Sequence, residues 1–224
     1  MVGLDASPLD DQQLEQWSLP KALLSHHSAF LKAACTNDFK ERDKNCINLP
    51  TDDPKIFALF VEWMIYRRCT IPAFWGCANS FAAAWVLGDK LMAPAFKDYA
   101  LSRLYMWHSS SSSFNSTTMA VAAKDVAYAL ANTTVGSPLR RFYLDFAATY
   151  FADPKRVTSS TEDWDEVILE HDDARIFLLR AFRAAPAERC FLKDVAHYME
   201  EDVGIQLGKN VPQMSSSTET ENTS

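Results

Sequence analysis

The chain has 224 residues, of which 48% are hydrophobic and 23% charged, a composition typical of globular proteins that can bury a sizeable core. Its formal net charge of −7 and its lack of Lys/Arg clusters argue against nucleic acid as the main partner, because phosphate binding depends on such clusters. Six glycines against 14 phenylalanines and six tryptophans favour packed helices over a turn-rich β-sandwich.

The first part of the chain predicts helices and one short strand. Residues 1–13 are polar and acidic, and we expect them to be disordered or an incomplete N-terminus. Apolar residues at helical spacing predict a helix over 21–35, in which Ser28 could cap a second short helix and divide the segment. A short strand is predicted at 46–50, where Pro50 ends it.

Prolines mark the starts of later helices. Asp53-Pro54 combines a capping side chain with proline at the first helical position. It predicts a helix that runs to about Tyr66 and is apolar on most faces, so we expect this helix to be buried. Two further helices are predicted at 79–90 and 94–107, the second again opened by proline.

A run of five serines marks the clearest linker, 108–118. It follows a helix-rich N-terminal domain at 14–107 and precedes a region over 119–203 that we expect to be all-α. The polar tail at 204–224 lacks aromatic residues and is expected to be disordered. The helices predicted in the C-terminal region cover 119–131, 138–152, 163–183 and 187–201.

No pattern in the sequence indicates a catalytic or metal site. There is no HExxH or His-x-x-x-His pair, no phosphate-binding glycine motif and no GxSxG elbow. His26 and His27 are neighbours, so about 100° separates them on a helix and they cannot easily converge on one ion. We therefore expect a non-enzymatic protein without a cofactor.

An acidic run, TEDWDEVILEHDD, covers residues 161–173. Asp163 and Asp165 superficially resemble the start of a calcium loop, but the central glycine and the terminal spacing of such loops are absent. Acidic residues after Thr161 instead fit a helix N-terminus, where they complement the helix dipole.

The sequence also shows no pattern typical of a membrane-spanning segment or of a signal peptide. The most hydrophobic stretch, 56–66, is too short to span a bilayer and contains Glu62. The first residues lack the apolar core of a signal peptide, and five cysteines without a CxxC pair fit reduced thiols. We expect a protein of the cytoplasm or nucleus that binds neither membranes nor, directly, nucleic acid.

Several motifs follow one another in a fixed order over residues 14–107. They are Lys-Ala-Leu-Leu in a first helix, a serine shortly before a phenylalanine, a short strand ending in Leu-Pro, Asp-Asp-Pro opening a Phe-rich helix, and a helix-turn-helix around Asp-Lys. The residues are Lys21–Leu24, Ser28 with Phe30, Ile47–Pro50, Asp52–Trp63 and Leu87–Leu104. This order resembles a BTB/POZ domain, and the later segment 126–151 is similar to the helical extension of many BTB proteins of filamentous fungi.

The resemblance implies an α+β fold, in which a helical cluster is flanked by a short β-sheet and followed by the all-α region. It also implies a protein-interaction module that forms a homodimer or heterodimer and assembles adaptor complexes. The helix that the family uses for this contact leads us to expect the dimer face at or near Leu23, His26, His27, Phe30 and Leu31.

Some family members bind a cullin scaffold and recruit substrates to a ubiquitin ligase, often through a hydrophobic-x-Glu motif before the short strand. Phe39 and Glu41 occupy that place here. Phe39 would fill an apolar pocket and Glu41 would supply a charge-assisted hydrogen bond. The alternatives are that Phe39 packs on its own domain with Glu41 solvated, and that the protein is a transcription-linked or structural scaffold without a ligase role.

The sequence departs from the family pattern near its start. The first strand of the family is not found, and Pro20 stands where members carry a histidine. We therefore expect an N-terminally shortened domain, which disfavours a strand-exchanged dimer. Such a domain would also leave a sheet edge with which another chain could pair.

Overall fold

The fold is known from a computed structural model that describes residues 15–36, 46–70, 77–109, 120–185, 188 and 191–200. The expected N-terminal segment 1–13 and the tail 204–224 lie outside the described residues, as do the serines at 110–113 of the expected linker. The elements in chain order are α1 (Lys21–His27), α2 (Ala29–Thr36), α4 (Pro54–Tyr66), α5 (Cys77–Lys90), α6 (Pro94–Ser109), β1 (Val121–Ala122), α7 (Ala123–Asn132), α8 (Pro138–Tyr150), β2 (Val157–Thr158), α9 (Thr161–Glu170), α10 (Asp172–Arg183) and the 3₁₀ helix η3 (Val195–Tyr198).

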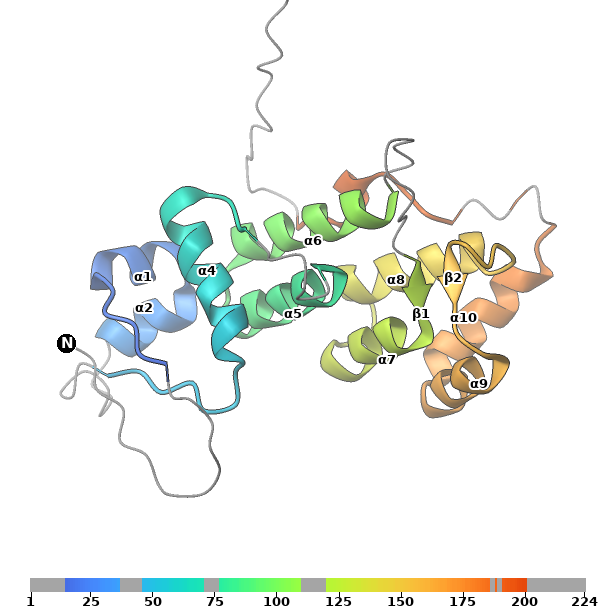
Figure 1. The fold of residues 1–224 in the computed structure, drawn as a ribbon, viewed down its shortest axis with the longest axis horizontal. Helices are drawn as coiled ribbons and strands as arrows, with labels where there is room; N and C mark the ends of the chain where they lie inside the picture. The colour runs from blue at the N-terminus through green and yellow to red at the C-terminus, as the bar shows by residue number, and fades with distance from the viewer. Residues whose placement is uncertain are drawn as a thin grey trace, which may run out of the picture.

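Helices form an elongated row, with α1, α2 and α4 at one end, α5 and α6 in the middle, and α7 to α10 at the other end (Figure 1). The two short strands pair in parallel, with Val121 opposite Val157 and Ala122 opposite Thr158. A mostly helical chain with a small sheet is consistent with the predicted α+β class.

Local capping explains where the first helices begin. Ser28 divides the predicted 21–35 helix, because its backbone is extended and its hydroxyl accepts a hydrogen bond from the Leu31 N–H at 2.9 Å. The same hydroxyl donates to the Leu91 carbonyl at 2.5 Å and so ties the junction to the turn between α5 and α6. The start of α4 is also as predicted, with Asp53 accepting from the Lys55 N–H at 2.8 Å.

The prediction of a short strand at 46–50 is wrong. Within the described residues no strand pairs with this segment, and its end forms a turn in which the Asp52 N–H donates to the Leu49 carbonyl at 3.3 Å. An unpaired strand gains no ladder hydrogen bonds, so the segment stays irregular. The described sheet, β1 with β2, lies in the C-terminal region, which is therefore not all-α as expected.

Two C-terminal helices also differ from the prediction. The expected helix 163–183 is divided at His171, whose backbone is extended (φ −129°, ψ 90°). This break lets α9 bury Trp164 and α10 bury Leu178 as two separate helices that pack against each other. Of the expected helix 187–201, the described part contains the 3₁₀ helix η3 and a 3₁₀ residue at 188, and no α-helix.

Side-chain acceptors explain why residues 191–193 are not helical. The hydroxyl of Thr149 on α8 accepts hydrogen bonds from the N–H groups of Phe191 and Leu192 at 3.1 and 2.9 Å. The Tyr198 hydroxyl accepts from the Lys193 N–H at 3.0 Å. These backbone donors are therefore satisfied without helical hydrogen bonds.

One hydrophobic core runs along the whole row of helices, and α6 belongs to both of its halves. At one end of α6, Phe96 packs against Phe60 with ring centroids 5.0 Å apart. At the other end, the ring centroid of the fully buried His108 lies 5.5 Å from that of Phe146 of α8. The first two residues of the expected 108–118 linker, His108 and Ser109, thus belong to α6.

Candidate interaction surface

His27 joins α1 to the end of α4. Its ring meets the indole of Trp63 edge-on, with centroids 5.3 Å apart and planes at 71°. The guanidinium of Arg67, the C-terminal cap of α4, lies 4.9 Å from the centre of the same indole, and its Nη1 is 3.4 Å from His27 Nδ1. The three side chains form one stack, which we call the His27–Trp63–Arg67 stack.

The environment of His27 keeps its ring neutral at neutral pH. Burial, the Arg67 guanidinium and the neighbouring His26 lower the pKa of His27 to about 4. Since Arg67 is always a donor, His27 Nδ1 acts as the acceptor. His26 is exposed, so the two histidines have different surroundings. In the part of the chain that the structure describes, no group of three or more His, Cys, Asp or Glu side chains could hold a metal ion.

Cys69, just beyond α4, is an unreactive thiol. Burial and then the nearby carboxylate of Glu62 raise the pKa of Cys69 to about 12, so the group stays protonated at neutral pH. The thiol donates to the Leu59 carbonyl at 3.3 Å. Glu62 itself accepts a hydrogen bond from the Thr70 N–H at 2.9 Å. These contacts close the end of α4 and indicate a structural role.

The residues predicted for the dimer face have different surroundings. Phe30 is 39% exposed and available to a partner. Leu23 is half-buried and packs against the core. Leu31 is only 1% exposed, because the turn at the Ser28 cap directs α2 so that Leu31 enters the core, and its place at or near the dimer face stays a prediction. Phe39 and Glu41 lie outside the described residues.

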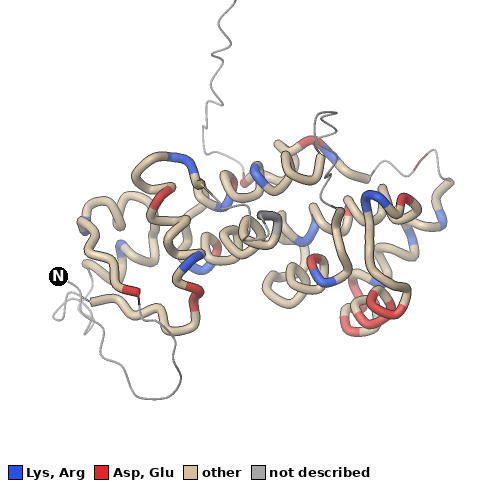
Figure 2. The backbone as a smooth tube through the Cα atoms, viewed as in Figure 1, with Lys and Arg blue, Asp and Glu red and all other residues tan. Residues whose placement is uncertain are grey.

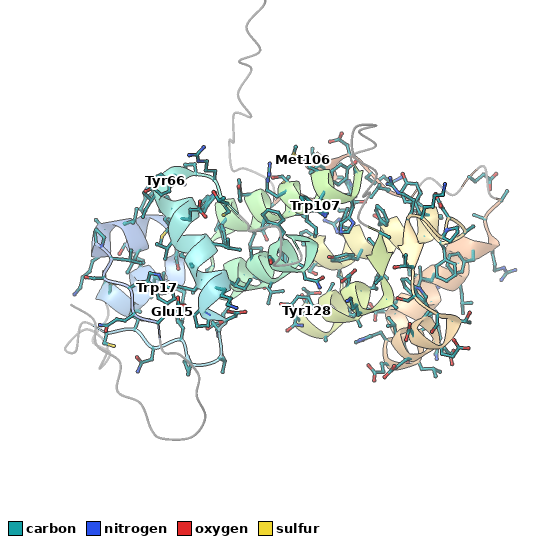
Figure 3. The ribbon with its side chains drawn as sticks, in the orientation of Figure 1. Glu15, Trp17, Tyr66, Met106, Trp107 and Tyr128 are labelled. Atoms are coloured by element: carbon teal, nitrogen blue, oxygen red, sulfur yellow. The ribbon has the colours of Figure 1, made fainter. Side chains whose placement is uncertain are left out.

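Exposed apolar side chains that the sequence did not single out lie around the same helices. Ile65 and Tyr66 end α4, next to the His27–Trp63–Arg67 stack, and Tyr66 is 64% exposed (Figure 3). Met92, 60% exposed, lies in the turn between α5 and α6, and its carbonyl accepts a hydrogen bond from the Ala29 N–H at 3.2 Å. Met92 and Phe30 therefore flank the same backbone contact.

No protein-family model, curated protein or solved structure matches the chain. The resemblance to BTB/POZ domains therefore rests on the sequence motifs. None of the described helices is both long enough and apolar enough to cross a membrane.

We define the α1–α2 surface as the exposed side chains on α1, on α2, at the end of α4 and in the α5–α6 turn. Its members are His26, Phe30, Ile65, Tyr66 and Met92. Large apolar and aromatic side chains grouped on a surface are typical of protein–protein contacts, where their burial supplies most of the binding free energy.

Proposed function

We propose that the chain is a non-enzymatic protein-interaction module of the BTB/POZ type, which acts in the cytoplasm or nucleus. The observation that carries this proposal is the α1–α2 surface, where exposed Phe30, Tyr66 and Met92 adjoin the helix pair that the resembling family uses for dimerisation. The order of motifs over residues 14–107 supports the same function.

The surface favours self-association as its main activity. Phe30 and Met92 flank the Ser28–Ala29 junction, which two hydrogen bonds hold to the α5–α6 turn. A partner that buried these side chains would bind to a pre-ordered surface, so the chain would lose little conformational entropy on binding. A homodimer or a heterodimer with a related domain fits this arrangement.

A cullin scaffold is the further partner that we propose, through Phe39 and Glu41 in the segment between α2 and residue 46. The test is a pull-down with a purified cullin N-terminal domain. Phe39→Ala and Glu41→Ala should each weaken binding about tenfold, because each would remove an anchor of the contact. Lys32→Ala, which removes an exposed charge on α2, serves as the control and should bind like the wild type.

The ligase role is contradicted if the wild-type chain does not bind the cullin domain. That result would favour the alternative, a transcription-linked or structural scaffold, and would leave self-association through the α1–α2 surface in place. Equal binding by all variants would contradict a contact through Phe39 and Glu41 and would place the cullin site elsewhere on the chain.

A further inference from the structure

An open cleft of about 440 Å³ lies between the end of α8, β2 and α9. These elements lie at the opposite end of the molecule from α1 and α2 (Figure 1). The cleft is mostly apolar, and the side chains that matter here are Phe151, Val157, Trp164, Ile168 and Phe182. Its volume is sufficient for one or two large side chains of a partner.

The aromatic part of the cleft is rigid. The Trp164 indole N–H donates to the Thr158 carbonyl at 2.9 Å, which fixes the ring of this buried residue. Phe151 packs against Trp164 at 5.3 Å and against Phe182 at 4.7 Å between ring centroids. Phe151 remains 37% exposed. A fixed aromatic cluster with one accessible ring is well suited to bind an apolar side chain.

The α9 wall of the cleft is acidic. Thr161, Trp164, Asp165 and Ile168 follow the i, i+3, i+4, i+7 spacing of one helix face, and all four line the cleft. The exposed carboxylate of Asp165 therefore lies at the edge of the aromatic cluster. Figure 2 shows the concentration of acidic residues on α9. The acidic residues of this helix are Glu162, Asp163, Asp165, Glu166 and Glu170, and it contains no Lys or Arg.

Among the described residues, most of these carboxylates have no partner of opposite charge. Asp163 accepts a hydrogen bond from the Ser160 N–H at 3.0 Å as part of the α9 cap. None of the other four acidic residues of α9 forms an ion pair with another residue that the structure describes. Three basic residues are sequence neighbours of the cleft lining on other elements. They are Lys155 and Arg156 in the turn before β2 and Arg183 at the end of α10. Besides the α9 carboxylates, the exposed Asp153 lies between the lining residues Ala152 and Pro154, so acidic groups outnumber basic ones around the cleft.

The charge of the chain argues against two possible occupants. In a two-fold contact of two copies through this cleft, the acidic α9 walls would lie close to each other and repel. Residues 201–224 contain four acidic residues and one lysine, so they do not complement α9 either. A basic segment from another protein does.

We propose that this cleft docks a basic segment of a partner protein. One aromatic or large aliphatic side chain of the segment inserts against Phe151 and Trp164. Flanking Lys or Arg side chains contact Asp165 and Glu166 on α9. The proposal concerns a surface separate from the α1–α2 surface and does not depend on the proposed dimerisation.

The test is a selection of random linear peptides, displayed on phage, on the full-length chain at low ionic strength. Selected peptides are then synthesised and titrated by fluorescence anisotropy. We expect them to carry Lys or Arg around an aromatic or aliphatic anchor, and we expect their binding to weaken as salt is added. Asp165→Lys should weaken binding about tenfold, because it reverses a charge at the edge of the cleft. Phe151→Ala should weaken binding by removal of the accessible ring.

The matched control is Glu15→Lys, which makes the same change of charge at an exposed residue near α2 (Figure 3). It should bind the peptides like the wild type. Asp165 is exposed, so a loss of binding by Asp165→Lys with an unchanged circular dichroism spectrum reports on the cleft and not on folding. The proposal is overturned if no selected peptide is sensitive to Asp165→Lys, or if the selected peptides lack basic residues.

Discussion

The imidazole of His27 contacts both the indole of Trp63 and the guanidinium of Arg67, so its protonation would bring two cations together. The pKa of His27 is about 4 in the folded chain against an ordinary value of 6.5. The unfolded chain therefore binds this proton more readily between those values. The stability that the neutral ring contributes is complete above pH 6.5 and is lost as the pH falls towards 4.

We predict that His27→Gln reduces this loss of stability in acid. The free energy of unfolding of the wild type should fall between neutral pH and pH 4 by about 1 kcal/mol more than that of the variant, after allowance for solvent screening. Urea denaturation at both pH values measures the difference. His26→Gln, which removes an exposed ring, should keep the acid loss, and an identical pH dependence in wild type and His27→Gln would contradict the assignment.

Single residues differ in how far the sequence predicts their role. Ser28 and Asp53 were identified as caps because a cap acts on N–H groups two or three residues away, within the local pattern. The neutral state of His27 depends on Arg67, 40 positions along the chain. The burial of Leu31 beside the exposed Phe30 depends on the packing of α2, which the local pattern does not contain.

At the scale of elements, the junction between α1 and α2 depends on Ser28. Its hydroxyl both caps α2 and holds the α5–α6 turn through the Leu91 carbonyl. We predict that Ser28→Ala lowers the free energy of unfolding by about 1–2 kcal/mol, the usual cost of a lost cap combined with a buried acceptor left without its donor. Chemical denaturation measures this change.

Ser25→Ala is the matched control for Ser28→Ala. Ser25 lies inside α1, and alanine is the better helix former there, so this change should be neutral or slightly stabilising. Equal stability of the Ser28→Ala variant and the wild type would mean that the junction does not depend on the two hydroxyl hydrogen bonds.

The elements that the sequence did not predict correctly are those that distant groups determine. The apolar pattern at 46–50 resembles a strand, but a strand needs a neighbour, and the described residues provide none. Residues 191 and 192 donate to the hydroxyl of Thr149, which lies 42 and 43 positions away. The starts of α4, α6 and α8 were predicted well, because proline marks each of them in the sequence itself and Asp53 and Ser137 cap α4 and α8.

At the scale of the whole molecule, the C-terminal segment returns to α6 and closes the row of helices. The Glu200 carboxylate pairs with Lys97, and the Glu200 N–H donates to Asp98 at 3.0 Å. The Tyr105 hydroxyl donates to the Lys193 carbonyl at 3.0 Å. These contacts hold the C-terminal segment against α6. The α1–α2 surface lies at one end of the row of helices and the cleft beside α9 lies at the other. An adaptor that binds one partner at each end would use such a shape.

The candidate site was predictable only in part. Motifs over residues 14–107 pointed to α1 and α2, and Phe30 on α2 is exposed. Tyr66 and Met92 were missed, because an apolar residue at the end of a buried helix or in a turn looks like a core residue in the sequence. Their exposure follows from how α4 and the α5–α6 turn pack, which is a property of the assembled fold.

The most direct test of the central claim is sedimentation velocity of the full-length chain over a range of concentrations. We predict a dimer for the wild type, and a shift to monomer for Tyr66→Lys and Met92→Lys, because each would bury a charge in the contact. Val135→Lys, at an exposed apolar residue between α7 and α8, should remain dimeric. A wild-type chain that is monomeric at every concentration, or Tyr66→Lys and Met92→Lys variants that dimerise as the wild type does, would contradict the claim.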